Sequence, residues 1–241
     1  MTNTPDLPAN PVFVALDTPV LDQALAWAGA VRGHVGGVKT GLEFFSANGA
    51  DGVRRIVDLG LPVFLDLKFH DIPNTVAGAV RAVAGLGAGI VNVHASGGPA
   101  MLDAAREAAE IAGGATRPLV IAVTVLTSMD DSDLDAVGQK SPASEQVVRL
   151  AQLSQAHGLD GVVCSPAEIE PLRAACGPDF KLIVPGIRPD WAATGDQKRI
   201  TTPRQARDRG ADILVIGRPI TGADDPAAAA NRIAEELGIT P

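Results

Sequence analysis

The sequence predicts an α/β protein built as a single (β/α)₈ barrel, the TIM-barrel architecture. Three observations indicate it: short apolar runs recur along the chain, segments with helical periodicity separate them, and several runs end in a charged or hydroxyl side chain. Near-continuous apolar strands that alternate with helices are typical of a parallel sheet covered by helices. Eight such units in 241 residues match a closed barrel. A doubly wound open sheet is the alternative that strand counting leaves open.

The apolar runs are the predicted strands. In chain order they are VFVALD (12–17), GGVKTG (36–41), PVFLDLK (62–68), IVNVHA (90–95), LVIAVTV (119–125), GVVCS (161–165), KLIVPGI (181–187) and DILVIGR (212–218). Segments between them carry apolar residues at helical spacing, as in LDQALAWAGAV (21–31), GVRRIVDLG (52–60) and SEQVVRLAQLSQAHG (144–158). No G-x-G-x-x-G follows the first run, which weakens the dinucleotide-binding version of the open sheet.

Composition favours one globular domain, with residues 1–10 as an N-terminal tail and residues 11–241 as the barrel domain. Apolar residues make up 46% of the chain, and the formal net charge of −8 disfavours non-specific binding to nucleic acid or to an anionic membrane. No apolar run approaches the ~20 residues of a membrane span, and the polar start does not resemble a signal peptide. Cys164 and Cys176 lack metal-ligand or redox spacing, so we expect a cytoplasmic protein.

The longest segment with weak secondary-structure signals is RPDWAATGDQKRITTP, residues 188–203. Loops of this length inside a compact domain are uncommon and are usually functional. The segment therefore predicts a lid over the site.

Polar side chains follow several of the predicted strands at the point where each strand ends. In a barrel all these ends meet at one face, which is the face that carries catalysis. We therefore expect them to converge in space although they are scattered along the sequence. They are Asp17, Lys39, Asp66, Lys68, Thr127, Arg188 and Arg218.

The stretch FLDLKFHDIPNTV, residues 64–76, concentrates charge after the third run. Asp66 and Lys68 are two residues apart and share one face of a strand, whereas Leu65, Leu67 and Phe69 face the helices. Asp71 has the opposite parity, so it can join the cluster only through its loop or from another copy of the chain. A lone D-x-K is more often a surface ion pair. The further cation Lys39 shifts the balance toward a functional site, because buried charge networks stabilise a fold weakly.

The loops after the seventh and eighth runs, PGIRPD and IGRPI, suggest a phosphate site. Barrels commonly bind phosphate at these two loops. Gly186 and Gly217 permit close approach of the backbone, and Arg188 and Arg218 supply planar cations that bind phosphate through paired hydrogen bonds.

Taken together, these motifs resemble the orotidine 5′-phosphate decarboxylase family. The resemblance runs from about Pro11 to Leu237 and is carried by VALD, VKTG, DxKxxDIPNT, VTVLTS, PGIRP, GDQKR and IGRPI. DxKxxD alone is shared with related phosphosugar lyases. Its combination with DIPNT, GDQKR and IGRPI is specific to this family.

The resemblance implies a homodimeric enzyme that uses no cofactor and no metal. It would convert orotidine 5′-monophosphate to uridine 5′-monophosphate and carbon dioxide, the last step of de novo UMP synthesis. The implied catalytic residues are Lys68, Asp66, Lys39 and Asp71. Asp71 and Thr75 would come from the partner subunit and hold the ribose, which would account for the parity of Asp71.

The resemblance also implies the substrate-binding positions. Asp17 and Lys39 would contact the ribose, Thr127 and Ser128 would lie near the pyrimidine, and Gln197 in the lid would bridge base and phosphate. The phosphate end would be held by Pro185, Arg188, Gly217 and Arg218. Some relatives use a lid tyrosine at the phosphate, but this chain contains no tyrosine. Arg188 and backbone amides would cover that contact.

Two other functions are compatible with parts of these patterns. One is a magnesium-dependent relative, a 3-keto-gulonate-6-phosphate decarboxylase or a hexulose-phosphate synthase, which a chelator would inactivate. The other is a non-catalytic sensor of a phosphate ligand, which would bind nucleotide without turnover and has no evident need for the Asp66–Lys68 pair.

Overall fold

The computed structural model describes residues 7–113, 117–192 and 201–239. Its strands form a closed barrel in chain order, and each strand pairs in parallel with both neighbours. The barrel prediction is therefore confirmed, because β1 pairs with β8 as well as with β2 and no sheet edge remains open. The strands are β1 (Val12–Ala15), β2 (Gly37–Gly41), β3 (Val63–Phe69), β4 (Ile90–His94), β5 (Leu119–Val123), β6 (Gly161–Val163), β7 (Lys181–Pro185) and β8 (Ile213–Ile216).

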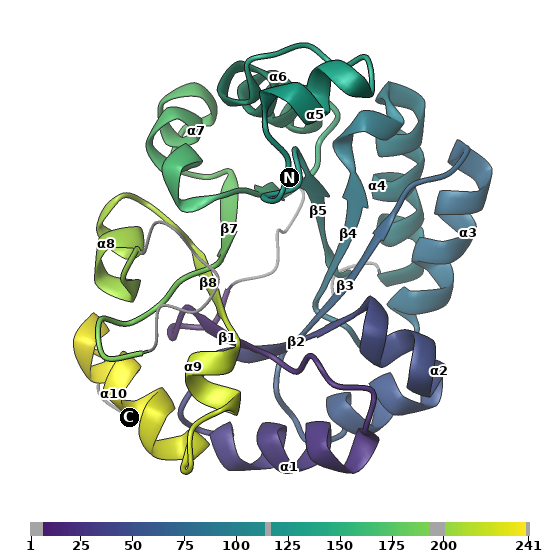
Figure 1. The fold of residues 1–241 in the computed structure, drawn as a ribbon. Coiled ribbons are helices and arrows are strands. Elements are labelled where there is room, and N and C mark those ends of the chain that lie inside the picture. Colours follow the sequence, from purple (N-terminus) through teal and green to yellow (C-terminus); the bar gives the residue numbers. More distant parts are fainter. Residues whose placement is uncertain (1–6, 114–116, 193–200, 240–241) are drawn as a thin grey trace.

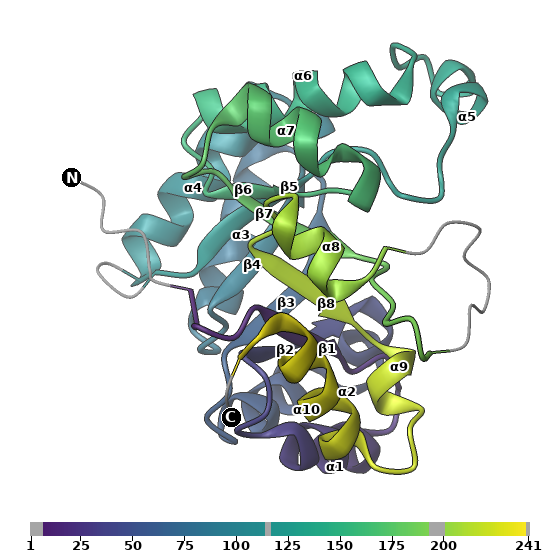
Figure 2. The same ribbon diagram turned by 90° about the vertical axis from the view of Figure 1, so that its left-hand side faces the viewer.

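Helices form a ring around the strands (Figure 1). They are α1 (Leu21–Val31), α2 (Leu42–Val57), α3 (Pro73–Ala84), α4 (Pro99–Gly113), α5 (Asp131–Ala136), α6 (Ala143–Ala156), α7 (Ile169–Cys176), α8 (Pro203–Asp208), α9 (Arg218–Thr221) and α10 (Pro226–Leu237). In the side view, α5 and α9 lie at the same end of the barrel, the end toward which β8 points (Figure 2). This end is the mouth at which the carboxyl ends of the strands meet.

Most predicted strands are correct in position but extend past the observed ends. The run 119–125, for example, leaves the ladder after Val123, and the run 161–165 leaves it after Val163. Sequence reasoning also found only the second half of α2. Gly49 interrupts that helix with φ 60° and ψ −158°, which breaks the apolar periodicity between its two halves.

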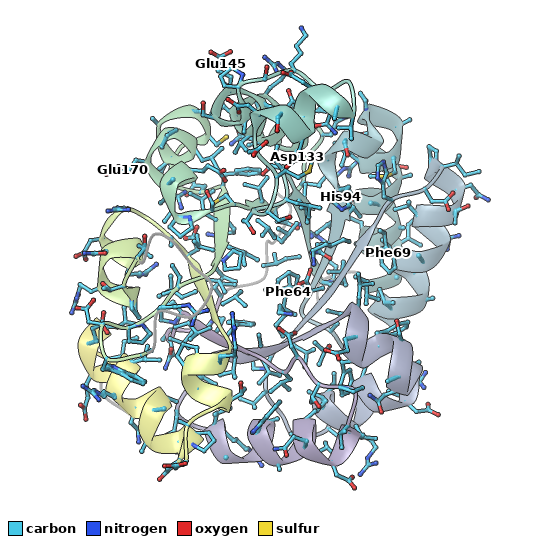
Figure 3. All side chains as sticks on the ribbon, in the orientation of Figure 1. Phe64, Phe69, His94, Asp133, Glu145 and Glu170 are labelled. Carbon is cyan, nitrogen blue, oxygen red and sulfur yellow. The ribbon has the colours of Figure 1, made fainter. Side chains whose placement is uncertain are left out.

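The apolar residues form two separate clusters. The inner cluster fills the barrel below the mouth with Phe13, Ala15, Phe64, Ile90, Leu119, Ile121, Ile183, Ile213 and Val215. The larger cluster lies between strands and helices, and it includes Leu65, Leu67, Val91 and Val93. Figure 3 places Phe64 near the centre of the ring and Phe69 nearer the helices. Because side chains alternate along a strand, this arrangement turns Asp66 toward the barrel interior, as predicted.

The strand β3 is irregular where it carries its charged residues. Its pairing with β4 shifts register between Leu65 and Phe69, and Lys68 adopts a left-handed backbone with φ 52°. A non-glycine residue in this conformation costs about 1 kcal/mol or more, and such strain is concentrated at functional sites.

The predicted N-terminal tail falls partly on residues 1–6, outside the described residues. Asn10, at the end of that tail, donates a hydrogen bond to the carbonyl of His34 (3.0 Å) and accepts one from the amide of Val12 (3.0 Å). These contacts attach the chain to the base of the barrel before β1 begins.

Candidate active site

A pocket of about 430 Å³ opens at the mouth of the barrel. The barrel brings together residues from β1, β2, β3, β5, β6, β7 and β8 around it, because all these strands end on the same face. Val215, Phe64 and Ile183 form part of its apolar floor. Among the predicted site residues, its lining contains Asp17, Lys39, Asp66, Lys68, Thr127, Pro185, Arg188, Gly217 and Arg218.

Four of these residues form a line of alternating charge. The Lys39 ammonium lies 2.9 Å from Asp17 Oδ1 and 3.4 Å from Asp66 Oδ2. The Lys68 ammonium lies 2.5 Å from Asp66 Oδ1. The side chains of Lys39 and Asp66 are only 11% and 13% exposed, which distinguishes this network from a surface ion pair.

The central carboxylate of the network is Asp66. Burial raises the pKa of this carboxyl, but the ammonium groups of Lys39 and Lys68, together with hydrogen bonds from Lys68 and Asn92, outweigh burial and hold the pKa below its ordinary value. Asp66 therefore carries a negative charge at neutral pH and fixes the Lys68 ammonium at the pocket wall.

His94 ends β4 beside this network, and its ring centroid lies 5.4 Å from that of His70. Burial lowers the pKa of His94, and the neighbouring His70 and Lys68 lower it further, whereas Asp66 acts in the opposite direction. The neutral form of the His94 imidazole is therefore favoured at pH 7.

The opposite wall of the pocket carries the two arginine loops. Arg188 follows β7 and is 6% exposed, while Arg218 is the first residue of α9, directly after Gly217. Gly186 has φ 78°, a conformation that allows the chain to turn sharply between Pro185 and Arg188. Two cations thus face the pocket across from Lys68. They could bind an anionic group at one end of a ligand.

Three predicted residues lie elsewhere in the described chain. Ser128 is exposed beside Thr127 but is not in the pocket lining. Asp71 and Thr75 are exposed near the start of α3, also outside the lining, and the Asp71 carboxylate accepts a hydrogen bond from the amide of Ile72 at 2.7 Å. Gln197 and half of the predicted lid, residues 193–200, fall outside the described residues.

Sequence reasoning missed Asn92. This residue lies in β4, is 0% exposed, and hydrogen-bonds both to the Asp66 carboxylate and to the Lys68 backbone. The available signal was an amide in the middle of the apolar run IVNVH, because a polar side chain inside a barrel strand needs buried hydrogen-bond partners.

Comparison with known proteins agrees with this geometry. A family model described as "Orotidine 5'-phosphate decarboxylase / HUMPS family" matches residues 10–233, which is nearly the whole chain. The chain belongs to this family.

Individual relatives of the orotidine 5′-phosphate decarboxylase / HUMPS family match over almost their full lengths. The chain is 56% identical over 233 residues to a protein of Paramagnetospirillum magneticum named orotidine 5′-phosphate decarboxylase, covering 95% of this chain and 99% of that one. A Rhodospirillum rubrum protein of the same name is 58% identical over 232 residues, covering 95% and 94%. The crystal structure of orotidine 5′-phosphate decarboxylase from Lactobacillus acidophilus superposes with a TM-score of 0.83 at 40% identity, covering 95% of this chain and 99% of that one.

The predicted family and the predicted barrel are thus both confirmed for this member of the orotidine 5′-phosphate decarboxylase / HUMPS family. None of the helices in the described part of the chain combines the length and the apolarity that a membrane crossing needs.

Proposed function

We infer that this chain is an orotidine 5′-phosphate decarboxylase, a carboxy-lyase that forms uridine 5′-monophosphate and carbon dioxide in pyrimidine biosynthesis. The observation that carries this function is the Lys68 ammonium, which is held at 2.5 Å by the largely buried Asp66 in the same pocket as Arg188 and Arg218. Relatives with 52–58% identity over nearly the whole chain bear the same name, which favours this function over the magnesium-dependent lyases.

The chemistry of the reaction fits a site made of fixed charges. Loss of carbon dioxide from C6 of the pyrimidine leaves an electron pair in the plane of the ring, which the π system of the ring cannot delocalise. Preorganised charge must stabilise this developing anion. In our proposal the Lys68 ammonium lies beside C6, stabilises the anionic transition state and then donates its proton to C6. Asp66 keeps that ammonium in place.

The remaining predicted site residues divide between the parts of the nucleotide. Arg188, Gly217 and Arg218 bind the phosphate, with Pro185 beside them in the binding set. Thr127 and Ser128 contact the pyrimidine. Asp17 and Lys39 contact the ribose hydroxyls, which is consistent with their 2.9 Å ion pair at the pocket wall. Gln197 is assigned to bridge base and phosphate.

A homodimer with a shared site is part of the proposal. Asp71 and Thr75 are exposed, whereas the other charged residues of the predicted network line the pocket of their own chain. Ile72, between them, is 68% exposed, so an apolar side chain lies beside both polar residues on the same surface. These facts support a two-fold dimer in which Asp71 and Thr75 of each subunit enter the site of the other.

Mixed dimers test this arrangement. Lys68→Ala and Asp71→Ala should each inactivate the homodimer. After subunit exchange between the two variants, the hybrid contains one site with both residues intact, so a 1:1 mixture should recover about a quarter of the wild-type activity. A site that takes Asp71 from its own chain would recover no activity on mixing.

A cytoplasmic location also belongs to the proposal. Cys164 and Cys176 are both buried free thiols, as is usual in a reducing compartment.

The proposed reaction can be tested with purified protein, chelator and orotidine 5′-monophosphate. Loss of the orotate chromophore, with uridine 5′-monophosphate as product, is expected at the same rate with and without chelator. Inactivation by the chelator would point to the magnesium-dependent lyases, and nucleotide binding without turnover would point to a sensor.

A further inference from the structure

The two strands β3 and β4 do not match in length where the charged network lies. Leu65 pairs with Val91 and Phe69 pairs with Val93. An advance of four residues along β3 therefore corresponds to an advance of only two along β4. The extra residues of β3 form a bulge that contains Asp66 and Lys68 and lies opposite Asn92. A bulge removes backbone groups from the ladder, and a buried amide that loses its ladder partner needs another acceptor.

Asn92 supplies that acceptor. Its Oδ1 accepts a hydrogen bond from the backbone amide of Lys68 at 2.7 Å, and its Nδ2 donates to Asp66 Oδ1 at 2.7 Å. The same carboxylate oxygen accepts from the Lys68 ammonium at 2.5 Å. One side chain therefore holds Lys68 at its backbone and, through Asp66, at its charged end.

The chemistry of the asparagine side chain suits both contacts at once. An amide presents an acceptor and a donor on the same planar group. A carboxylate at this position would repel the Asp66 carboxylate, and an apolar side chain would form a hydrogen bond with neither partner. Asn92 is fully buried and follows Ile90, a member of the inner cluster, by two residues, so it points into the barrel. Burial of such a group is costly unless both its ends are bonded, and here both partners belong to the Asp66–Lys68 pair.

We propose that Asn92 is a positioning residue for decarboxylation. It fixes the left-handed backbone of Lys68, with φ 52°, and the orientation of the Asp66 carboxylate, and thereby aims the ammonium into the pocket. This inference rests on the proposed function of the site. Asn92 is not in the pocket lining, so it acts through Lys68 and Asp66 rather than on the nucleotide.

The test compares Asn92→Ala with Asn10→Ala. Asn10 makes the same two kinds of hydrogen bond, one to a backbone amide and one to an oxygen, but at the base of the barrel. In Asn92→Ala, kcat should fall by about 10²-fold, the effect of a displacement of about 1 Å at the reacting group. The Kd for uridine 5′-monophosphate should change by less than about fivefold, because the arginine loops are untouched. Asn10→Ala should lower the melting temperature and leave kcat unchanged.

A second variant, Asn92→Asp, keeps the acceptor for the Lys68 amide. Its new carboxyl can donate to Asp66 only when it is protonated, and it repels Asp66 when it is ionised. The ratio of its kcat to that of Asn92→Ala should therefore rise as the pH is lowered from 8 toward 5. A purely structural role would give no such dependence.

If the wild type turns over normally, any of three results would overturn this inference without affecting the proposed function. Asn92→Ala could keep its full kcat, or it could lose kcat and nucleotide affinity equally. The ratio of kcat in Asn92→Asp to kcat in Asn92→Ala could also stay constant with pH. A wild-type protein that fails to decarboxylate orotidine 5′-monophosphate would instead overturn the proposed function, and this inference with it.

Discussion

Replacement of Lys68 by alanine should lower kcat by about 10⁵-fold, the combined effect of losing a proton donor and a fixed charge at the reacting carbon. Affinity for uridine 5′-monophosphate should stay within about tenfold of the wild type, because the lost interaction is made with charge that develops only in the transition state. Single-turnover kinetics and equilibrium titration with the product nucleotide measure the two quantities separately.

The matched control for this variant is Lys181→Ala. Lys181 begins β7 at the opposite end of the barrel from the mouth, so its removal changes the net charge equally without touching the pocket. Its kcat should equal that of the wild type. Near-normal turnover in Lys68→Ala would rule out this lysine as the proton donor, and a parallel loss of product affinity would assign it to ground-state binding.

Removal of Arg218 should have the second largest effect. A hydrogen bond to a charged group contributes about 1.5–3 kcal/mol, which corresponds to a loss of about 10- to 150-fold. We expect Arg218→Ala to lower kcat/KM by more than this, because the binding energy of the phosphate is also used to organise the loops around the reacting end of the substrate. Steady-state kinetics with orotidine 5′-monophosphate gives the value.

A truncated substrate can show whether phosphate binding also organises the site or only adds a contact of its own. A nucleoside that lacks the phosphate should react slowly with the wild type, and added phosphite dianion should restore part of the rate. Arg218→Ala should respond much less to phosphite, whereas Arg209→Ala, which removes an exposed arginine at the end of α8, should respond as the wild type does. Absence of phosphite activation in the wild type would contradict this use of the phosphate.

The local pattern of the sequence was sufficient to predict the barrel and much of the pocket. An apolar run marks the position of each strand, and polar residues such as Asp17 and Arg188 lie at or just after the ends of these runs. The period of two along β3 also placed Asp66 on the inner face and Leu65 and Leu67 on the helix side. These features depend only on residues that are close together in the chain.

The role of Asn92 could not be predicted in this way. It depends on how β4 is registered against β3, and the register is set by contacts between residues about 25 positions apart in the chain. The left-handed backbone of Lys68 has the same origin, since the apolar–charged alternation of FLDLKF indicates an ordinary strand.

The sequence by itself therefore determined the fold, the family and the residue types at the mouth, because apolar periodicity and strand-end chemistry are local properties of the chain. Only the tertiary structure decided which of these groups touch. Closure of the barrel brings Lys39 and Asp17 to 2.9 Å, and the mismatch between β3 and β4 leaves an amide that Asn92 must bind. Distances of this kind follow from the packing of separate strands, which no single segment encodes.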